Sequence, residues 1–225
     1  MVNLDTILIT GAGSGLGKEL ALQYAAEGNK VVLVGRSRDK LLEVNEMINN
    51  SGGEATCYAV DVSNITKVEE VISNVLNKHS VSFLINNAGV GHFGSLSSLS
   101  NLHIEEMVRS NILGTIGMTK ALLPHLLTLK HAKVMNIIST AGLKGKVNES
   151  VYVASKFAIR GFTESLVKEL EGSTVSVTAV YMGGMNTPFW DNAKTHIKEK
   201  SRLRSPEEIA AVIINEYQGQ PEIFI

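Results

Sequence analysis

Short apolar runs rich in β-branched residues alternate along this chain with longer stretches in which apolar residues recur every three or four positions. The short runs predict strands, and the longer stretches predict amphipathic helices. The predicted strands are Thr6–Thr10, Val31–Val34, Thr56–Val60, Val81–Ile85, Lys133–Ser139, Val175–Val180 and Glu222–Ile225. Because nearly all of their residues are apolar, both faces of the sheet should be covered. We therefore predict an α/β fold, a doubly wound parallel sheet with helices on both faces.

Nothing in the sequence divides the chain into separate folding units. A length of 225 residues fits one large domain or two small ones. The strand–helix alternation continues without a Pro-rich or low-complexity linker, so we predict a single domain over residues 1–225. Residues 205–208, Ser-Pro-Glu-Glu, combine an N-cap, a first-turn proline and a capping-box glutamate, which predicts a final helix to about Tyr217. Residues 183–204 are expected to form a flap.

Composition and charge exclude several kinds of protein. The chain is 44% hydrophobic and 19% charged, which is ordinary for a globular protein. With 21 Lys and Arg against 22 Asp and Glu, its formal charge of −1 gives no basic excess for binding nucleic acid or a membrane surface. A single cysteine and an N-terminus without a leader pattern predict a cytoplasmic protein. The six histidines show no metal-ligand spacing, so no metal site is expected.

A glycine-rich turn joins the first predicted strand to the first predicted helix. Gly11, Gly15 and Gly17 fit the pattern T-G-x-x-x-G-x-G, whereas the spacing fits neither G-x-G-x-x-G nor a P-loop. Glycines at such a turn let the backbone approach a pyrophosphate, whose charge then lies at the helix N-terminus. Glycines also cap helices and make tight bends, but the strand–turn–helix context favours a dinucleotide site.

The end of the second predicted strand bears on the choice of cofactor. NAD sites place an acidic residue about 20 positions after the glycines, where it accepts hydrogen bonds from the ribose hydroxyls. Here residues 34–38 read Val-Gly-Arg-Ser-Arg, without an acid. A guanidinium pairs with a 2′-phosphate, which a carboxylate would repel. We therefore favour NADP(H) over NAD(H), with Arg36 as the main contact. The alternative is that Arg36 and Arg38 are solvated charges at a helix start.

Three residues in the second half of the chain could perform acid–base chemistry. Tyr152 and Lys156 are four residues apart in a predicted helix, so their side chains share one face. A phenol has an ordinary pKa of about 10, and a nearby ammonium lowers that pKa. Aided by the positive nicotinamide ring of a cofactor, the lysine is expected to bring it near 7. Ser139 ends the fifth predicted strand, where its hydroxyl could stabilise a developing oxyanion. The alternatives are a surface Tyr–Lys pair and a serine that only begins a loop.

With these residues in this order, the chain resembles the short-chain dehydrogenase/reductase family over essentially its whole length. The glycine turn, the Asn-Asn-Ala-Gly segment at residues 86–89 and the thirteen-residue separation of Ser139 and Tyr152 match the family's motifs. The resemblance implies a Rossmann-type fold. The catalytic residues that it implies are Asn111, Ser139, Tyr152 and Lys156. The predicted cofactor contacts are Gly11, Ser14, Gly15, Leu16, Gly17, Arg36, Asp61, Val62, Asn87, Ala88, Gly89, Tyr152, Lys156 and Thr187.

The resemblance also implies a reaction. NADPH would deliver hydride to a carbonyl carbon while Tyr152 protonates the oxygen that Ser139 holds, and the reverse reaction would use Tyr152 as the base. Lys156 would bind the nicotinamide ribose and tune Tyr152, and Asn111 would keep a water on Lys156. Asp61 is expected near the adenine ring.

Two departures from the family pattern concern the end of the chain. Met182-Gly183 stands where the family usually has Pro-Gly, which frees the backbone at the start of the flap. Thr187, in that flap, is expected at the nicotinamide carboxamide. The chain ends at Ile225 without the family's usual tail. We therefore expect a homodimer or homotetramer that associates through the long helices on either side of the fifth strand.

The expected function is that of an NADP(H)-dependent oxidoreductase that interconverts a carbonyl and a secondary alcohol. Its substrate would be a 3-oxoacyl thioester or a small ketone or aldehyde, and the alternative is a non-catalytic NADP(H)-sensing regulatory protein of the same fold. The predicted pocket segments are Gly89–Ser95, Ala141–Asn148 and the flap, and no aromatic box or charged anchor stands out among them. Five basic residues in or beside the flap form either a solvated face or a docking site for an acidic partner. These are Lys194, Lys198, Lys200, Arg202 and Arg204.

Overall fold

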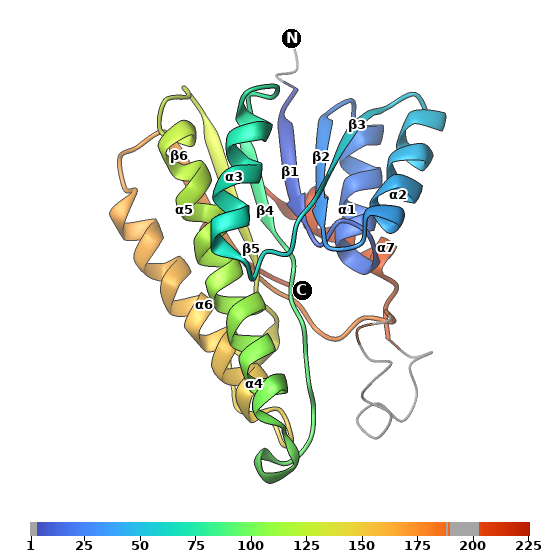
Figure 1. Ribbon diagram of the computed structural model, residues 1–225. Helices are drawn as coiled ribbons and strands as arrows, with labels where there is room; N and C mark the ends of the chain where they lie inside the picture. Colours follow the sequence, from blue (N-terminus) through green and yellow to red (C-terminus); the bar gives the residue numbers. More distant parts are fainter. Residues whose placement is uncertain (1–3, 188, 190–202) are drawn as a thin grey trace.

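The predicted strands pair in parallel into one seven-stranded sheet, in the order β3-β2-β1-β4-β5-β6-β7 (Figure 1). The computed structural model describes residues 4–187, 189 and 203–225. The strands are β1 Thr6–Thr10, β2 Lys30–Gly35, β3 Glu54–Ala59, β4 Phe83–Asn86, β5 Ala132–Ile137, β6 Val175–Tyr181 and β7 Glu222–Phe224. This is the Rossmann-type doubly wound sheet that the alternating pattern predicts.

Helices cover both faces of the sheet. They are α1 Gly15–Ala26, α2 Arg38–Asn50, α3 Ile65–Leu76, α4 Asn101–Met107, α5 Gly114–Leu126, α6 Ser150–Glu169 and α7 Pro206–Glu216. A π-helical segment, Val108–Leu113, joins α4 to α5, and short 3₁₀ turns occupy Leu96–Ser98 and Thr140–Gly142. The capping box of α7 forms as predicted: the Ser205 hydroxyl accepts from Glu208 N, and the Glu208 carboxylate accepts from Ser205 N.

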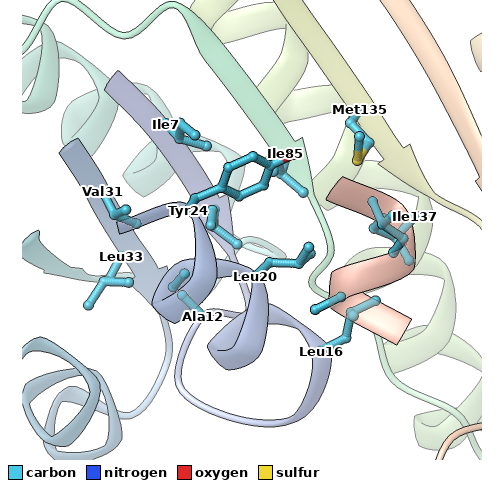
Figure 2. Packing of buried hydrophobic residues seen from close by; sticks show 14 of the residues in the cluster. Ile7, Ala12, Leu16, Leu20, Tyr24, Val31, Leu33, Ile85, Met135 and Ile137 are labelled. Atoms are coloured by element: carbon cyan, nitrogen blue, oxygen red, sulfur yellow. The ribbon is translucent and has the colours of Figure 1, made fainter. Parts of the chain in front are cut away.

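The core consists of two main apolar layers, one on each face of the sheet. Helices α1, α2 and α7 pack on one face, and α3, α5 and α6 pack on the other (Figure 1). Figure 2 shows Leu16, Leu20 and Tyr24 of α1 over the apolar side chains of the central strands. The regular spacing of these α1 residues is what the helical periodicity predicts.

The edge strand β3 departs from the predicted covering of both faces. All of its residues are partly or fully exposed, whereas Phe83–Asn86 of β4 are all buried. The reason is its position, because an edge strand has a neighbour on one side only.

Among the described residues, no helix has both the length and the apolar character needed to cross a bilayer.

The topology fixes where a ligand can bind. The chain crosses from edge strand β3 back to β4 beside β1, so the strand order reverses between β1 and β4. In open α/β sheets this switch point leaves a crevice at the carboxyl ends of the strands. Thr10 ends β1 and Asn86 ends β4, which brings the glycine turn and the Asn-Asn-Ala-Gly segment to that crevice.

Candidate active site

Hydrogen bonds lock the glycine turn to the loop that follows β4. The Thr10 hydroxyl accepts from the backbone N–H groups of Asn87 and Ala88, each at 3.0 Å. The Asn87 side-chain amide donates back to the Thr10 carbonyl oxygen at 3.0 Å. The Asn87 side chain therefore fixes the shape of the crevice by binding the turn itself.

The glycines of the turn have different structural roles. Gly11 and Gly15 have φ values of +67° and +53°. Glycine is favoured at such positive φ values because it has no Cβ atom to clash. Gly17 lies beneath the turn, where an added methyl group would collide with the Gly11 carbonyl oxygen and the Asn87 amide. Gly17 thus permits close packing of α1 on the turn.

The start of α1 suits an anion. Ser14 is its N-cap but makes no side-chain capping hydrogen bond, and the first turn contains no acidic residue. The first N–H groups of a helix lack intrahelical partners and carry the positive end of its dipole. The turn and helix start therefore fit the pyrophosphate of a dinucleotide, the group that the sequence pattern predicts.

A cavity of about 580 Å³ runs along this edge of the sheet. Its volume lies in the ordinary range for small-molecule sites, roughly 300–1,000 Å³. It brings together most of the predicted site residues: Gly11, Ser14, Gly15, Leu16, Arg36, Asp61, Val62, Asn87, Ala88, Gly89, Ser139, Tyr152, Lys156 and Thr187. Of the predicted residues, Gly17 and Asn111 do not line this cavity.

Tyr152 and Lys156 lie on one face of α6 and are both buried, with relative exposures of 7% each. The Lys156 ammonium donates to the Ile137 carbonyl oxygen at 3.1 Å, and its Nζ lies 5.8 Å from the centroid of the Tyr152 ring. The Ser139 side chain lies close enough to the Tyr152 phenol to lower its pKa. The three side chains therefore converge at one end of the cavity.

Ser139 follows β5 rather than ending it, because the strand stops at Ile137. Its φ of 116° and ψ of 151° cannot continue a strand, and this region of backbone space is occupied almost only by glycine. Its hydroxyl accepts from Ala141 N at 3.2 Å, at the start of the 3₁₀ turn. This unusual backbone accompanies a Ser139 side chain that lies beside Tyr152 at the cavity.

Burial sets the protonation of the Tyr–Lys pair. It raises the pKa of the Tyr152 phenol, the Ser139 side chain opposes that rise, and the Glu149 carboxylate adds to it. Burial also lowers the pKa of the Lys156 ammonium to about 8. Desolvation therefore dominates the phenol pKa in the protein alone. The lowering of this pKa by Lys156 together with the positive nicotinamide ring of a bound cofactor stays a prediction.

Asn111 lies in the π-helical segment between α4 and α5. Its carbonyl oxygen accepts from Val90 N at 2.8 Å, and its amide donates to Val90 O at 2.9 Å and Ser155 Oγ at 3.0 Å. The side chain thereby joins the loop after β4 to α6 next to Lys156. The water on Lys156 that the family resemblance implies stays a prediction.

A buried polar network supports the strands behind the site. The Asn86 amide donates to Thr119 Oγ1 and Asn136 Oδ1, both at 2.9 Å. The Asn136 amide in turn donates to Thr163 Oγ1 at 2.9 Å. The network connects β4 and β5 to α5 and α6, so the first asparagine of the Asn-Asn-Ala-Gly segment is a structural residue.

At the other end of the cavity, Arg36 meets two residues that the sequence did not single out. The Arg36 guanidinium (Nη1) pairs with Glu106 Oε1 at 3.4 Å, and Glu106 Oε2 accepts from His92 Nε2 at 2.8 Å. The His92 ring stacks on His103, with centroids 4.1 Å apart. Arg36 and Glu106 are 70 positions apart, so no local pattern could have revealed their contact.

Aromatic and charged side chains gather around Tyr152 at one end of the cavity. The rings of Phe93 and Phe189 lie 5.5 and 5.7 Å from the Tyr152 ring, and 5.8 Å from each other. Lys146 and the buried Glu149 also line the cavity there. The sequence did not single these side chains out. Phe189 lies far from Phe93 in the sequence, and only the fold shows that they meet.

The described ends of the flap meet at its base. Met185 forms a bridge with Arg204, and Asn186 N donates to Arg204 O at 3.0 Å. Thr187 lies against Gly15 and lines the cavity, with Met182-Gly183 in place of Pro-Gly. Arg204 is exposed. The other residues of the basic cluster, Lys194, Lys198, Lys200 and Arg202, lie outside the described residues.

Comparison with known proteins places this site in context. A family model described as short chain dehydrogenase matches residues 5–198. The fatty acyl-CoA reductase of Acinetobacter baylyi is 33% identical over 218 residues, which cover 96% of this chain and 73% of that protein.

Solved structures show the same fold. A short chain dehydrogenase/reductase from Burkholderia phymatum in complex with NAD has a TM-score of 0.89 at 25% identity, covering 98% of this chain and 88% of that chain. An alcohol dehydrogenase from the archaeon Thermococcus sibiricus, complexed with 5-hydroxy-NADP, has a TM-score of 0.89 at 26% identity, covering 99% and 96%. Complexes with NAD and with an NADP derivative thus both occur among the structural neighbours.

Proposed function

Because this chain belongs to the short-chain dehydrogenase family of oxidoreductases, we propose that it interconverts a carbonyl and a secondary alcohol with NADP(H). The convergence of Ser139, Tyr152 and Lys156 at one end of a cavity that begins at the glycine turn is the observation that carries this proposal. A regulatory protein that only sensed the cofactor would need the turn but would not need these three side chains together.

The chain's own residues supply proton transfer and orientation. Ser139 holds the carbonyl oxygen, and Tyr152 donates the proton that this oxygen needs as it becomes an alcohol. When bound, the reduced nicotinamide supplies the hydride. Lys156 binds the nicotinamide ribose and favours the phenolate that remains on Tyr152. Asn111 holds Val90 and Ser155, and through them the geometry around Lys156.

The cofactor-binding residues follow the length of the cavity. The turn from Gly11 to Leu16 would hold the pyrophosphate. Asp61 and Val62 would bind the adenine, and Ala88, Gly89 and Thr187 would bind the nicotinamide part. Arg36 would pair with the 2′-phosphate, which supports NADP(H) over NAD(H). The preference rests on this one guanidinium.

The substrate end favours a carbonyl compound with an apolar part. Phe93 and Phe189 form an aromatic wall beside Tyr152, and the similar Acinetobacter baylyi protein is a fatty acyl-CoA reductase. A 3-oxoacyl thioester and a small ketone or aldehyde both fit this description. The two classes differ in the length of chain beyond the carbonyl, so one panel of substrates separates them.

The test is NADPH oxidation, followed by absorbance, with a panel of 3-oxoacyl thioesters, ketones, aldehydes and diketones. The wild-type protein is compared with Tyr152→Phe, and with Tyr58→Phe as a matched control on the edge strand β3. We expect Tyr152→Phe to bind NADPH with unchanged affinity in calorimetry and to lose turnover, while Tyr58→Phe keeps it. Full turnover in Tyr152→Phe would exclude the assigned proton donor, and no turnover with any compound would favour the cofactor-sensing alternative.

Assembly and location complete the proposal. Val108, Leu113 and Phe157 are exposed apolar residues of the helical segments on either side of β5, and Phe224 is exposed on the last strand. We propose a homodimer or homotetramer whose interface covers the helical residues. We propose that the protein works in the cytoplasm. Light scattering of wild type and Phe157→Glu tests it: the variant should have the lower mass, and an unchanged mass would exclude this interface.

A further inference from the structure

The tertiary structure supplies an acid where the sequence has none. An NAD site needs a carboxylate near the adenosine ribose, usually at the end of the second strand. The end of β2 in this chain carries Arg36 instead, but α4 brings the Glu106 carboxylate to within 3.4 Å of that guanidinium. Arg36 and Glu106 both line the cavity.

Glu106 is held in this position from a third element. Its second carboxylate oxygen accepts a hydrogen bond from His92, in the loop after β4, at 2.8 Å. This hydrogen bond is the largest cause of a lowered pKa for the Glu106 carboxyl, to which Arg36 also contributes. The carboxylate is therefore charged at neutral pH and is directed at the guanidinium.

We propose that Glu106 is a specificity-determining residue, which competes with the 2′-phosphate for Arg36 and accepts a ribose hydroxyl when that phosphate is absent. The inference rests on the proposed cofactor site. It means that the preference for NADP(H) is smaller than Arg36 alone would give, and that NAD(H) is a usable second cofactor.

The physical basis is an exchange of partners at one guanidinium. A phosphate that pairs with Arg36 must displace the carboxylate and then remain close to it, and like charges at that distance repel. An unphosphorylated ribose has hydroxyls that donate to a carboxylate and meets no such repulsion. Side-chain exposures of 57% for Arg36 and 40% for Glu106 mean that solvent screens both effects.

The experiment measures binding rather than turnover. Dissociation constants for NADP⁺ and NAD⁺, and for the fragments 2′,5′-ADP and 5′-AMP, are determined by calorimetry at low salt. Glu106→Gln is compared with Glu105→Gln, which removes the same charge from the neighbouring exposed position. We expect Glu106→Gln to shift the NADP⁺/NAD⁺ affinity ratio toward NADP⁺ by roughly two- to fivefold, the range for a partly exposed charge pair. The fragment ratio should shift alike.

A third variant separates this inference from the proposed function. If Arg36→Gln weakens NADP⁺ but Glu106→Gln shifts the ratio no more than Glu105→Gln, Glu106 has no role in discrimination and the proposed cofactor site stands. If Arg36→Gln leaves NADP⁺ affinity unchanged, the proposed phosphate contact is wrong and the competition at Arg36 is overturned with it.

Discussion

Charged and polar side chains form both ends of the cavity, but they are buried at one end and exposed to solvent at the other. Tyr152 and Lys156 are 7% exposed, and the Lys156 ammonium donates to a backbone carbonyl. At the adenosine end, more than half of the Arg36 side chain and two fifths of the Glu106 side chain face solvent. Both groups of residues line one cavity, yet burial dominates the energetics of one group and solvent exposure that of the other.

Desolvation controls the protonation of the side chains at the catalytic end, whereas screening by solvent controls the strength of the ion pairs at the adenosine end. Burial at the catalytic end disfavours both charged forms, which raises the pKa of Tyr152 and lowers that of Lys156 to about 8. Solvent at the adenosine end weakens every ion pair and makes it sensitive to salt. Changes at the catalytic end should therefore have large effects that salt hardly alters, and changes at the adenosine end should have small, salt-dependent ones.

After the loss of turnover expected for Tyr152→Phe, the largest effect is expected at Ser139. Loss of its hydroxyl in Ser139→Ala should lower kcat by about 10²–10³-fold, as for other oxyanion donors, in the NADPH assay with the best substrate of the panel. Ser139→Gly should lose as much activity but relieve the backbone at φ 116°. Because such positions cost about 1–3 kcal/mol in a residue with a side chain, the Gly variant should unfold at a higher urea concentration than the Ala variant.

Both Ser139 variants lose the hydrogen bond between the hydroxyl and Ala141 N. The difference between their stabilities therefore reports the backbone strain alone. Equal stability of the Ala and Gly variants would show that the backbone at Ser139 is unstrained. Retention of activity in both would show that the hydroxyl holds no substrate oxygen.

The next effect concerns stability and pH at Lys156. Its folded pKa of about 8 lies below its ordinary value of 10.5, so the cost of burying the ammonium is fully present below pH 8 and disappears as pH rises toward 10.5. Lys156→Met should therefore raise the free energy of unfolding at pH 7 by about 2–3 kcal/mol, less at each step above pH 8. Urea unfolding without cofactor at pH 7, 8.5 and 10 measures this.

Lys168→Met, an exposed position on the same helix, is the control and should change little at any pH. A gain for Lys156→Met that stays constant from pH 7 to pH 10 would contradict the assigned burial cost.

A smaller effect is expected for Arg36→Gln at the exposed end. NADP⁺ should bind roughly tenfold more weakly at low salt, which corresponds to about 1.4 kcal/mol, and the difference should shrink as salt screens the guanidinium. Calorimetric titrations at several salt concentrations measure it. Arg38→Gln, whose side chain does not line the cavity, should behave like wild type. A loss that salt does not reduce would mean that Arg36 acts in a desolvated site, which would break the contrast between the two ends.

The smallest effect is expected for His92→Asn. Without the 2.8 Å hydrogen bond from His92, the Glu106 carboxylate is less firmly held beside Arg36. The NADP⁺/NAD⁺ affinity ratio should shift toward NADP⁺ by about twofold, less than for Glu106→Gln, as fits an exposed pair. Adding His92→Asn to Glu106→Gln should change nothing further. A shift toward NAD⁺ would contradict the positioning of Glu106 by His92.

Much of the fold could be predicted from local patterns. Apolar runs and helical periodicity gave the strand–helix alternation, and the capping box placed the start of α7 correctly. Boundaries were less certain: the fifth strand was predicted to end at Ser139 but ends at Ile137. Ser139, two residues later, has a φ of 116°, which cannot continue a strand and which an apolar run does not reveal.

The sequence by itself determined those features of the site whose parts are close along the chain. Spacing alone puts Tyr152 and Lys156 on one helix face and the glycines at one turn, because a helix or a turn has a fixed local geometry. The tertiary structure alone decided that α4 presents Glu106 to Arg36 and that Phe189 lies beside Phe93. It also decided the balance of charge at Tyr152, because burial is a property of everything packed around a residue and has no counterpart in its spacing.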